Sequence, residues 1–218
     1  EAAARRLAHP EASARRAALD VLAQLVPYGD AQAIDAVAAH LEHPEEALRQ
    51  SALEGLCKCG AGHERAVAAC CARLEHHDER VRMFAAQALP TIAGGSRESA
   101  CEGAILRMGH HLAAVRSAAL CALCHLGIRH DTRVIEGVVR LMVDPAASVR
   151  QAALDAFGQL ADRGSPQAVA FLAALLANSH AGTRERAVRA LACVTNRGDE
   201  EAIRVVARYL RHRRGRGR

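Results

Sequence analysis

The chain has 218 residues, half of them hydrophobic, with no tryptophan, two tyrosines and three phenylalanines. So few aromatic residues argue against ligand sites built from aromatic side chains, and the many alanines favour closely packed helices. The formal charge is +5, but five arginines within residues 211–218 supply it, which leaves 24 basic and 24 acidic side chains elsewhere. A nucleic-acid-binding surface spread over the body of the chain is therefore not expected.

An arginine recurs every 33 or 34 residues and marks six repeats. Alanine stands three residues after each of these arginines, and a large apolar residue stands seven residues after it. The repeat arginines are Arg15, Arg49, Arg82, Arg116, Arg150 and Arg184. A period of this size indicates a solenoid, in which each repeat buries its apolar face against its neighbours. We predict one array over residues 1–210, with a partial first repeat, five full repeats and a terminal helix, followed by a basic tail at 211–218.

Each repeat is predicted to form two helices, called helix A and helix B below. Helix A precedes the arginine, because apolar residues lie 15, 12, 11 and 8 positions before it, which is the spacing of one helix face. In the second repeat these residues are Ile34, Val37, Ala38 and Leu41. Helix B contains the arginine and is predicted to bury the position before it and the positions 3, 4, 7 and 10 after it.

The predicted helix boundaries follow the same period along the chain. Helix A is expected to start after Asp30, His63, Ser96 or Arg97, Asp131, Ser165 and Asp199. Helix B is expected to start six residues before the arginine, at His9, His43, His76, His110, Asp144 and Asn178. Most of these side chains can accept a hydrogen bond from the free backbone amides of a helix N-terminus.

A family resemblance rests on Asp144, Val149 and Arg150, in which the arginine follows the aspartate by six residues. This pattern resembles HEAT repeats, and in particular the short HEAT-like repeats of phycobilisome lyases. The resemblance implies an all-α, armadillo-like, right-handed α-solenoid of two-helix repeats. The other repeats depart from the family pattern, because histidine or asparagine stands where the fifth repeat has Asp144.

The segment Cys121-Ala122-Leu123-Cys124-His125 matches the C-x-x-C-H motif of covalent haem attachment. A haem also needs an apolar pocket and usually a second axial ligand, whereas this segment lies within a predicted packed helix. A zinc site on the two cysteines and His125 lacks an identified fourth ligand. Both alternatives stay open, although we expect no cofactor and no metal.

Four further cysteines, Cys57, Cys59, Cys70 and Cys71, suggest a second metal site. The last three stand where other repeats carry leucine, isoleucine or valine, so we expect buried thiols that act as small hydrophobic side chains. The chain shows no membrane span and no signal peptide. We therefore expect an intracellular, reducing compartment, either the cytoplasm or an organelle reached after processing.

A sequence motif tests for one enzymatic activity that occurs in proteins with HEAT-like repeats. Deoxyhypusine hydroxylase, which is built from similar repeats, binds two irons through His-Glu dipeptides placed just after the repeat arginine. The second and fifth repeats have Gln50-Ser51 and Gln151-Ala152 there, and the only His-Glu pair is His63-Glu64, in a predicted turn. We predict a protein that is not an enzyme and has no catalytic residues.

The predicted function is a non-catalytic scaffold or adaptor that binds other proteins and forms a piece or subunit of a larger assembly. The resemblance implies that helix B lines the concave side of the solenoid. The side chains expected to face a partner there are Arg16, Gln50, Glu54, Met83, Phe84, Gln87, Ser117, Cys121, Gln151, Asp155 and Arg189. Met83 and Phe84 are the candidate apolar anchors. Two alternatives are nucleic-acid binding by the arginine-rich tail and an accessory or lyase-like role in bilin or metal chemistry.

A second contact surface is predicted on the outer side of helix A near the C-terminal end. Positions that carry His40, Arg73 and Arg107 in earlier repeats become apolar in later ones. The residues of this outer apolar patch are Leu141, Phe171, Leu175 and Tyr209. A contiguous apolar patch indicates a surface covered by a partner subunit or by further sequence.

Overall fold

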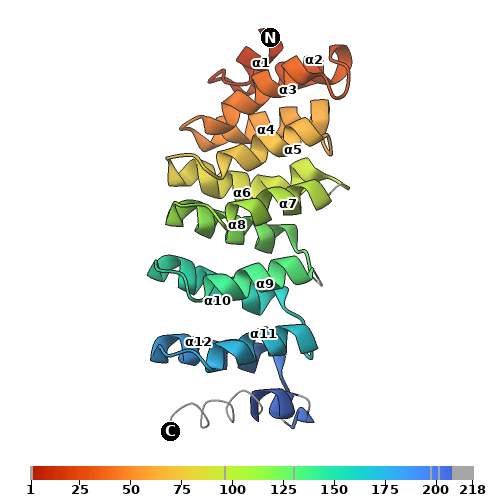
Figure 1. The fold of residues 1–218 in the computed structure, drawn as a ribbon. Coiled ribbons are helices and arrows are strands. Elements are labelled where there is room, and N and C mark those ends of the chain that lie inside the picture. Colours follow the sequence, from red (N-terminus) through yellow and green to blue (C-terminus); the bar gives the residue numbers. More distant parts are fainter. Residues whose placement is uncertain (1, 96, 130, 197, 201, 208–218) are drawn as a thin grey trace. The chain divides into compact units, whose positions relative to one another are not determined.

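A computed structural model describes residues 2–95, 97–129, 131–196, 198–200 and 202–207 of the chain. Across these ranges the regular secondary structure is helical, with no strand (Figure 1). The helices follow one another as pairs, with helix A and helix B of each repeat side by side, as the sequence period predicts. Glycines with positive φ, such as Gly29 and Gly164, form the turns between repeats, where an L side chain would be strained.

The first four repeats contain these helices: α1 (Ala2–Arg6), α2 (Ala12–Leu25), α3 (Ala31–Ala38) with the 3-10 helix η1 (Ala39–Glu42), α4 (Glu46–Gly60), α5 (Glu64–Arg73), α6 (Glu79–Ala93), α7 (Arg97–Arg107) and α8 (Ala113–Leu126). The fifth and sixth repeats contain α9 (Thr132–Leu141), α10 (Ala147–Leu160), α11 (Pro166–Leu176) and α12 (Ala181–Val194). Residues 200 and 202–207 are also helical. Odd-numbered helices are the A helices and even-numbered helices are the B helices.

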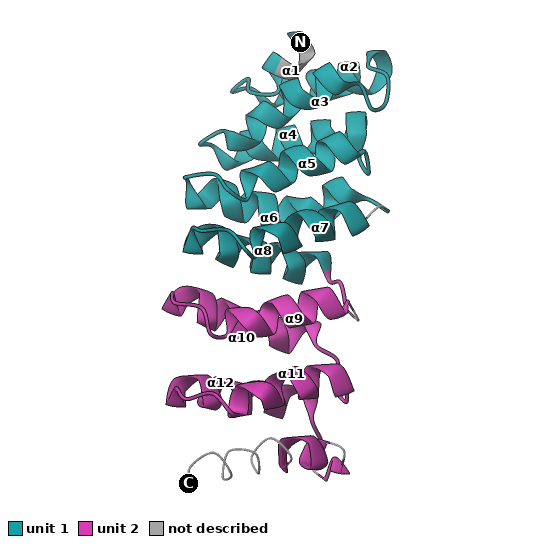
Figure 2. Cartoon of the chain, in the orientation of Figure 1, with its two compact units in different colours: residues 1–126 teal, residues 127–218 magenta. Residues whose placement is uncertain are grey.

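The chain forms two compact units, Glu1–Leu126 and Gly127–Arg218, called unit 1 and unit 2 (Figure 2). Inside unit 1, α2, α4, α6 and α8 contact one another in succession, as do α1, α3, α5 and α7. Inside unit 2, α10 contacts α12 and α9 contacts α11. Each unit therefore has a layer of A helices and a layer of B helices. The single array over residues 1–210 stays a prediction.

The core lies between the two layers and contains the predicted positions. All six alanines three residues after the repeat arginines are buried, and so are the apolar residues seven after them. Ile34, Val37, Ala38 and Leu41 of the second repeat are buried as predicted. Ile203 of the predicted terminal helix is 59% exposed, and two predicted core residues of the B helices are exposed as well, Leu25 at 74% and Val188 at 57%.

Both exceptions in the B helices lie where a neighbouring helix is short or lacking among the described residues. Leu25 ends α2, whose partner α1 has five residues, against ten in α5 and eleven in α7. The equivalent residues Cys59, Ile92 and Leu126 are fully buried. Val188 lies four residues after the last repeat arginine, and no B helix is described after α12. A position with the right period is buried only where the adjacent helix is present.

Helix B starts three residues later than predicted. In every repeat the first helical residue lies three positions before the arginine, for example Glu46 before Arg49 and Ala147 before Arg150. The residue six positions before the arginine stays outside the helix, because its side chain accepts a hydrogen bond from the backbone amide two residues later. The predicted start is therefore a capping turn that precedes the helix.

The repeat arginines hold this turn in place. Nη1 of Arg49 donates to the carbonyl oxygens of His43 and Pro44 at 2.8 and 2.9 Å. The same pair of bonds is made by Arg15, Arg82, Arg116, Arg150 and Arg184. Because both acceptors are backbone carbonyls, the arginine contact does not depend on an aspartate side chain at the first position. This explains how histidine and asparagine can replace Asp144 in the other repeats.

The buried alanines are predicted to be packing constraints. Ala153 of α10 is fully buried between the layers, so Ala153→Leu adds three carbons where neighbouring side chains leave no space. We expect the free energy of unfolding to fall by about 1–3 kcal/mol, measured by urea denaturation. Ala147→Leu, at the exposed start of the same helix, should change it by less than about 0.5 kcal/mol. If the two substitutions lower the free energy of unfolding equally, the face of α10 that carries Ala153 is not the face that packs in the core.

Candidate binding surface

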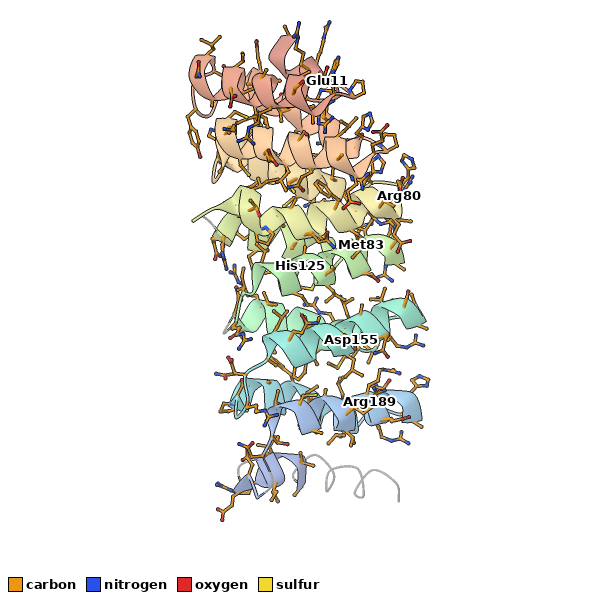
Figure 3. The ribbon with its side chains drawn as sticks, turned by 180° about the vertical axis from the view of Figure 1, so that it is seen from behind. Glu11, Arg80, Met83, His125, Asp155 and Arg189 are labelled. Atoms are coloured by element: carbon orange, nitrogen blue, oxygen red, sulfur yellow. The ribbon has the colours of Figure 1, made fainter. Side chains whose placement is uncertain are left out.

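The exposed face of the B helices carries most of the predicted partner-binding residues. In unit 1, Arg16, Gln50, Glu54 and Gln87 are exposed, whereas Met83, Phe84, Ser117 and Cys121 are half-buried. In unit 2, Gln151, Asp155 and Arg189 are exposed. Figure 3 labels Met83 on α6 in unit 1, and Asp155 on α10 and Arg189 on α12 in unit 2. These residues form two separate rows, one on each unit.

Phe84 covers the repeat arginine of the preceding repeat. The guanidinium carbon of Arg49 lies 5.3 Å from the centre of the Phe84 ring, and Arg49 is only 6% exposed. Its Nε has no hydrogen-bond acceptor among the described residues, whereas Nε of Arg15 donates to Oγ of Ser51, 3.0 Å away. Ser51 and Phe84 occupy the same position of successive repeats. The ring of Phe84 thus makes a cation–π contact where Ser51 makes a hydrogen bond, which gives Phe84 a structural role.

The equivalent position in unit 2 is Arg186, a residue that the sequence did not single out. Its Nε donates to the carbonyl oxygen of Met142 at 2.8 Å, and its Nη2 donates to Oγ1 of Thr183 at 3.2 Å. Burial and the nearby guanidinium of Arg150 lower the pKa of Arg186. At Ser51 and Phe84 in unit 1 and at Arg186 in unit 2, the residue two after the repeat arginine thus contacts the previous repeat. The side chains at this position differ so much between repeats that the sequence does not reveal the contact.

A row of charged contacts joins successive A helices of unit 1. Glu42 accepts from Arg73 at 3.0 Å and lies 3.7 Å from Nε2 of His76. One repeat later, Glu75 accepts from Arg107 at 2.8 Å and lies 3.8 Å from His110.

The sequence contains the pattern behind this row. A glutamate lies seven positions before one repeat arginine, and an arginine and a histidine lie nine and six positions before the next repeat arginine. Helical spacing alone places Arg73 and Arg107 on the outer, solvent-facing side of helix A. Both side chains are in fact half-buried and paired. Their guanidinium groups reach a carboxylate of the previous repeat and also donate to the carbonyl oxygens of Ala69 and Gly103 on their own helices.

The cysteines form no disulfide within the described part of the chain, and Cys59, Cys70 and Cys71 are buried as predicted. Burial raises the pKa of Cys59 and of Cys71 to about 11, and also raises that of Cys70. Cys121 and Cys124 are half-buried, and burial raises the pKa of Cys121. Within the described ranges, the structure brings together no group of three histidine, cysteine, aspartate or glutamate side chains that could hold a metal ion. A thiol with a raised pKa is a poor nucleophile and metal ligand at neutral pH.

The outer apolar patch predicted on the A helices is not a continuous exposed surface. Leu141, the last residue of α9, is only 8% exposed. Phe171 and Leu175 are half-buried. Tyr209 and the basic tail at 211–218 lie outside the described residues.

The paired helices, the repeated arginine contacts and the two layers in each unit define an all-α repeat solenoid. A family model for HEAT repeats matches residues 34–103, 102–192 and 135–217. The chain therefore belongs to the HEAT-repeat family. None of the helices in the described ranges is both long and apolar enough to cross a membrane.

Known structures give only distant likenesses. One engineered protein is 21% identical and covers 88% of this chain and 97% of its own, with a TM-score of 0.42. A designed armadillo repeat protein in complex with the peptide (KR)4 is 17% identical, covers 88% and 98%, and has a TM-score of 0.44. No curated protein matches the sequence.

Proposed function

We propose that this HEAT-repeat chain is a non-catalytic scaffold or adaptor that binds other proteins through the exposed face of its B helices. Membership of a repeat family supports this proposal, because stacked repeats offer an extended surface. The observation that carries the proposal is Met83. It is a half-buried apolar side chain on α6, with exposed Gln50 on the preceding B helix and exposed Gln87 on its own helix.

This arrangement has the composition of a binding hot spot. Partner-binding energy usually concentrates in a few large side chains that a polar rim shields from water. Methionine is unbranched and polarisable, so it adapts to different apolar partners. Gln50, Glu54 and Gln87 are exposed and supply polar groups around it. We infer that an apolar side chain of the partner packs on Met83. Polar groups of the partner then form hydrogen bonds with the side-chain amides of Gln50 and Gln87.

The test is the affinity of the purified chain for the protein that co-purifies with it, once that protein has been identified by mass spectrometry. Met83→Glu should weaken binding at least about tenfold, because a carboxylate would have to be buried against an apolar group. Leu106→Glu is the matched control, since Leu106 is a 76% exposed apolar residue on α7, an A helix. If the control weakens binding as much as Met83→Glu does, the partner does not bind through the B-helix face.

The remaining alternatives rest on the sequence alone. Nucleic-acid binding would use the tail at 211–218, and the lyase-like role in bilin or metal chemistry rests on the resemblance to phycobilisome lyases. No described residue favours either alternative. We also propose that the protein works in a reducing compartment, which the buried thiols of Cys59, Cys70 and Cys71 support.

A further inference from the structure

A backbone hydrogen bond recurs at the end of helix B. The carbonyl oxygen ten residues after the repeat arginine accepts it from the turn before helix A of the same repeat. In three repeats the donor is the amide of a glycine with positive φ: Gly29 for Cys59, Gly62 for Ile92 and Gly164 for Val194, at 2.8, 2.7 and 2.7 Å. A carbonyl at the end of a helix has no following turn to supply a donor. This bond therefore satisfies it and ties the end of helix B to the start of helix A.

The fourth repeat satisfies the same carbonyl with a side chain. Nη1 of Arg97, the first residue of α7, donates to the carbonyl oxygen of Leu126 at 2.9 Å. Leu126 is the last residue of α8. A guanidinium group thus takes the place that a glycine amide has in the other three repeats.

The fifth repeat leaves this carbonyl without a donor. No residue in the described ranges donates to the carbonyl oxygen of Leu160, which is the equivalent position. The donor glycines Gly29 and Gly164 directly precede the residue that caps helix A, whereas Gly127 precedes Asp131 by four residues. Leu160 is only 1% exposed. A buried carbonyl without a donor lowers stability unless a water molecule or a ligand binds to it.

A cavity of about 310 Å³ lies beside this carbonyl and has Leu160 in its lining. The space around the neighbouring turn is open, because a methyl group at Gly164 would meet no described atom within 4 Å. In unit 1 a methyl group at Gly29 would lie 3.0 Å from the ring of His63. Ligand pockets start at about this volume, which suits a group of side-chain size. The cavity is called the Leu160 site below, and its lining includes Thr132, Leu160, Asp162, Arg163, Ser165 and Gln167.

The lining of the Leu160 site favours a ligand that donates several hydrogen bonds. Leu160 ends α10, so its carbonyl lies at the negative end of the helix dipole. Asp162 adds a carboxylate, and Ser165 and Gln167 add side-chain oxygens. A guanidinium group is planar, carries five N–H donors and binds carboxylates through two parallel hydrogen bonds.

The groups that would favour an anion are weaker. Helices α9 and α11 start at the site, but their first turns are already capped. Oδ1 of Asp131 accepts from the amide of Arg133 at 2.9 Å, and Oγ of Ser165 accepts from the amide of Ala168 at 3.3 Å. Arg163 is exposed, so solvent and salt screen its charge. The buried acceptor therefore decides the sign of the ligand, rather than the exposed cation.

We propose that the Leu160 site binds a guanidinium group, either the arginine side chain of a partner protein or a free guanidinium compound. The guanidinium donates to the carbonyl oxygen of Leu160, as Arg97 does at Leu126, and pairs with the carboxylate of Asp162. This inference does not rest on the proposed function, which is carried by Met83 of unit 1.

The test is an NMR titration of the whole isotope-labelled chain with N-acetylarginine N-methylamide, which mimics an arginine side chain in a peptide. We expect saturable binding, with the largest shift at the carbonyl carbon of Leu160. N-acetyllysine N-methylamide has the same charge but no planar fork, and should bind about fivefold more weakly or worse. Free L-arginine distinguishes the two sources of the ligand. Tighter binding than the mimic indicates a free compound, and weaker binding indicates a protein side chain.

Three variants test the sign of the ligand. Asp162→Asn should weaken binding of the mimic by about tenfold, through the lost charge-assisted hydrogen bond. Arg163→Gln should leave binding unchanged or strengthen it, because it removes a like charge. Glu185→Gln is the matched control and should change binding by less than about twofold. It removes an exposed carboxylate near the start of α12, whereas the turn that lines the site contacts the end of that helix at Val194.

The opposite pattern, with weaker binding in Arg163→Gln and not in Asp162→Asn, would show an anion site and overturn the inference. Equal binding of the lysine mimic would also overturn it. The shift at Leu160 is measured on the wild-type chain, so it decides the matter even if a variant fails to fold. No shift there at saturating arginine mimic would show that no guanidinium reaches this carbonyl.

Discussion

Replacing Phe157 with alanine is expected to lower the free energy of unfolding by about 3–5 kcal/mol, the largest effect among the substitutions considered. Phe157 is fully buried seven residues after Arg150, where the other repeats carry leucine. Removing its ring loses the transfer free energy of the apolar atoms and leaves a cavity between α10 and its neighbours. Helices of one unit cannot close such a cavity without losing contacts elsewhere.

The measurement is urea denaturation followed by circular dichroism, with Phe171→Ala as the control. Phe171 lies on α11 in the same unit and is half-buried, so its loss should cost roughly half as much or less. Similar losses from the two phenylalanines would show that the ring of Phe157 is not enclosed by the core of unit 2.

The second large effect is expected at a repeat arginine. Arg49→Met keeps an unbranched apolar chain but removes the donor for the carbonyl oxygens of His43 and Pro44. It also removes the cation under Phe84. Hydrogen bonds from charged groups contribute about 1.5–3 kcal/mol each, and part of the loss is recovered by burying methionine, so we expect a net destabilisation of about 2–4 kcal/mol.

Arg16→Met is the matched control for this substitution, since Arg16 lies one residue after the repeat arginine of the first repeat and is exposed. Its replacement should change stability by less than about 0.5 kcal/mol. If both variants unfold at the same urea concentration, the turn before helix B does not depend on its arginine.

Much of the fold could be predicted from the sequence, because the period encodes it directly. The buried positions of helix A and the alanine three after each arginine follow from 3.6-residue spacing alone. The start of helix B was placed three residues too early, because a side chain that caps a turn resembles one that caps a helix. Both kinds of side chain can accept from the amide two residues later, as His43 does before α4 and as Asp131 does at the start of α9, so the residue type does not distinguish them.

The candidate surface was less predictable, because contacts between repeats depend on side chains that the period does not constrain. Leu141 has the spacing of an outer-face residue, yet it is only 8% exposed. Phe84 was proposed as a partner anchor, but its ring lies over Arg49. Both results depend on how neighbouring segments pack against the helix. The period of the sequence carries no information about that packing.

The central claim, protein binding through the B-helix face, is tested most directly by photocrosslinking. A photoreactive amino acid is placed at the exposed position 87 on α6 or 155 on α10, and for comparison at the exposed position 68 on α5 or 174 on α11. The identified partner is then mixed with each variant and irradiated. Our account predicts crosslinks from at least one of the two B-helix positions and none from the A-helix positions. Crosslinks from 68 or 174, with none from 87 or 155, would contradict it.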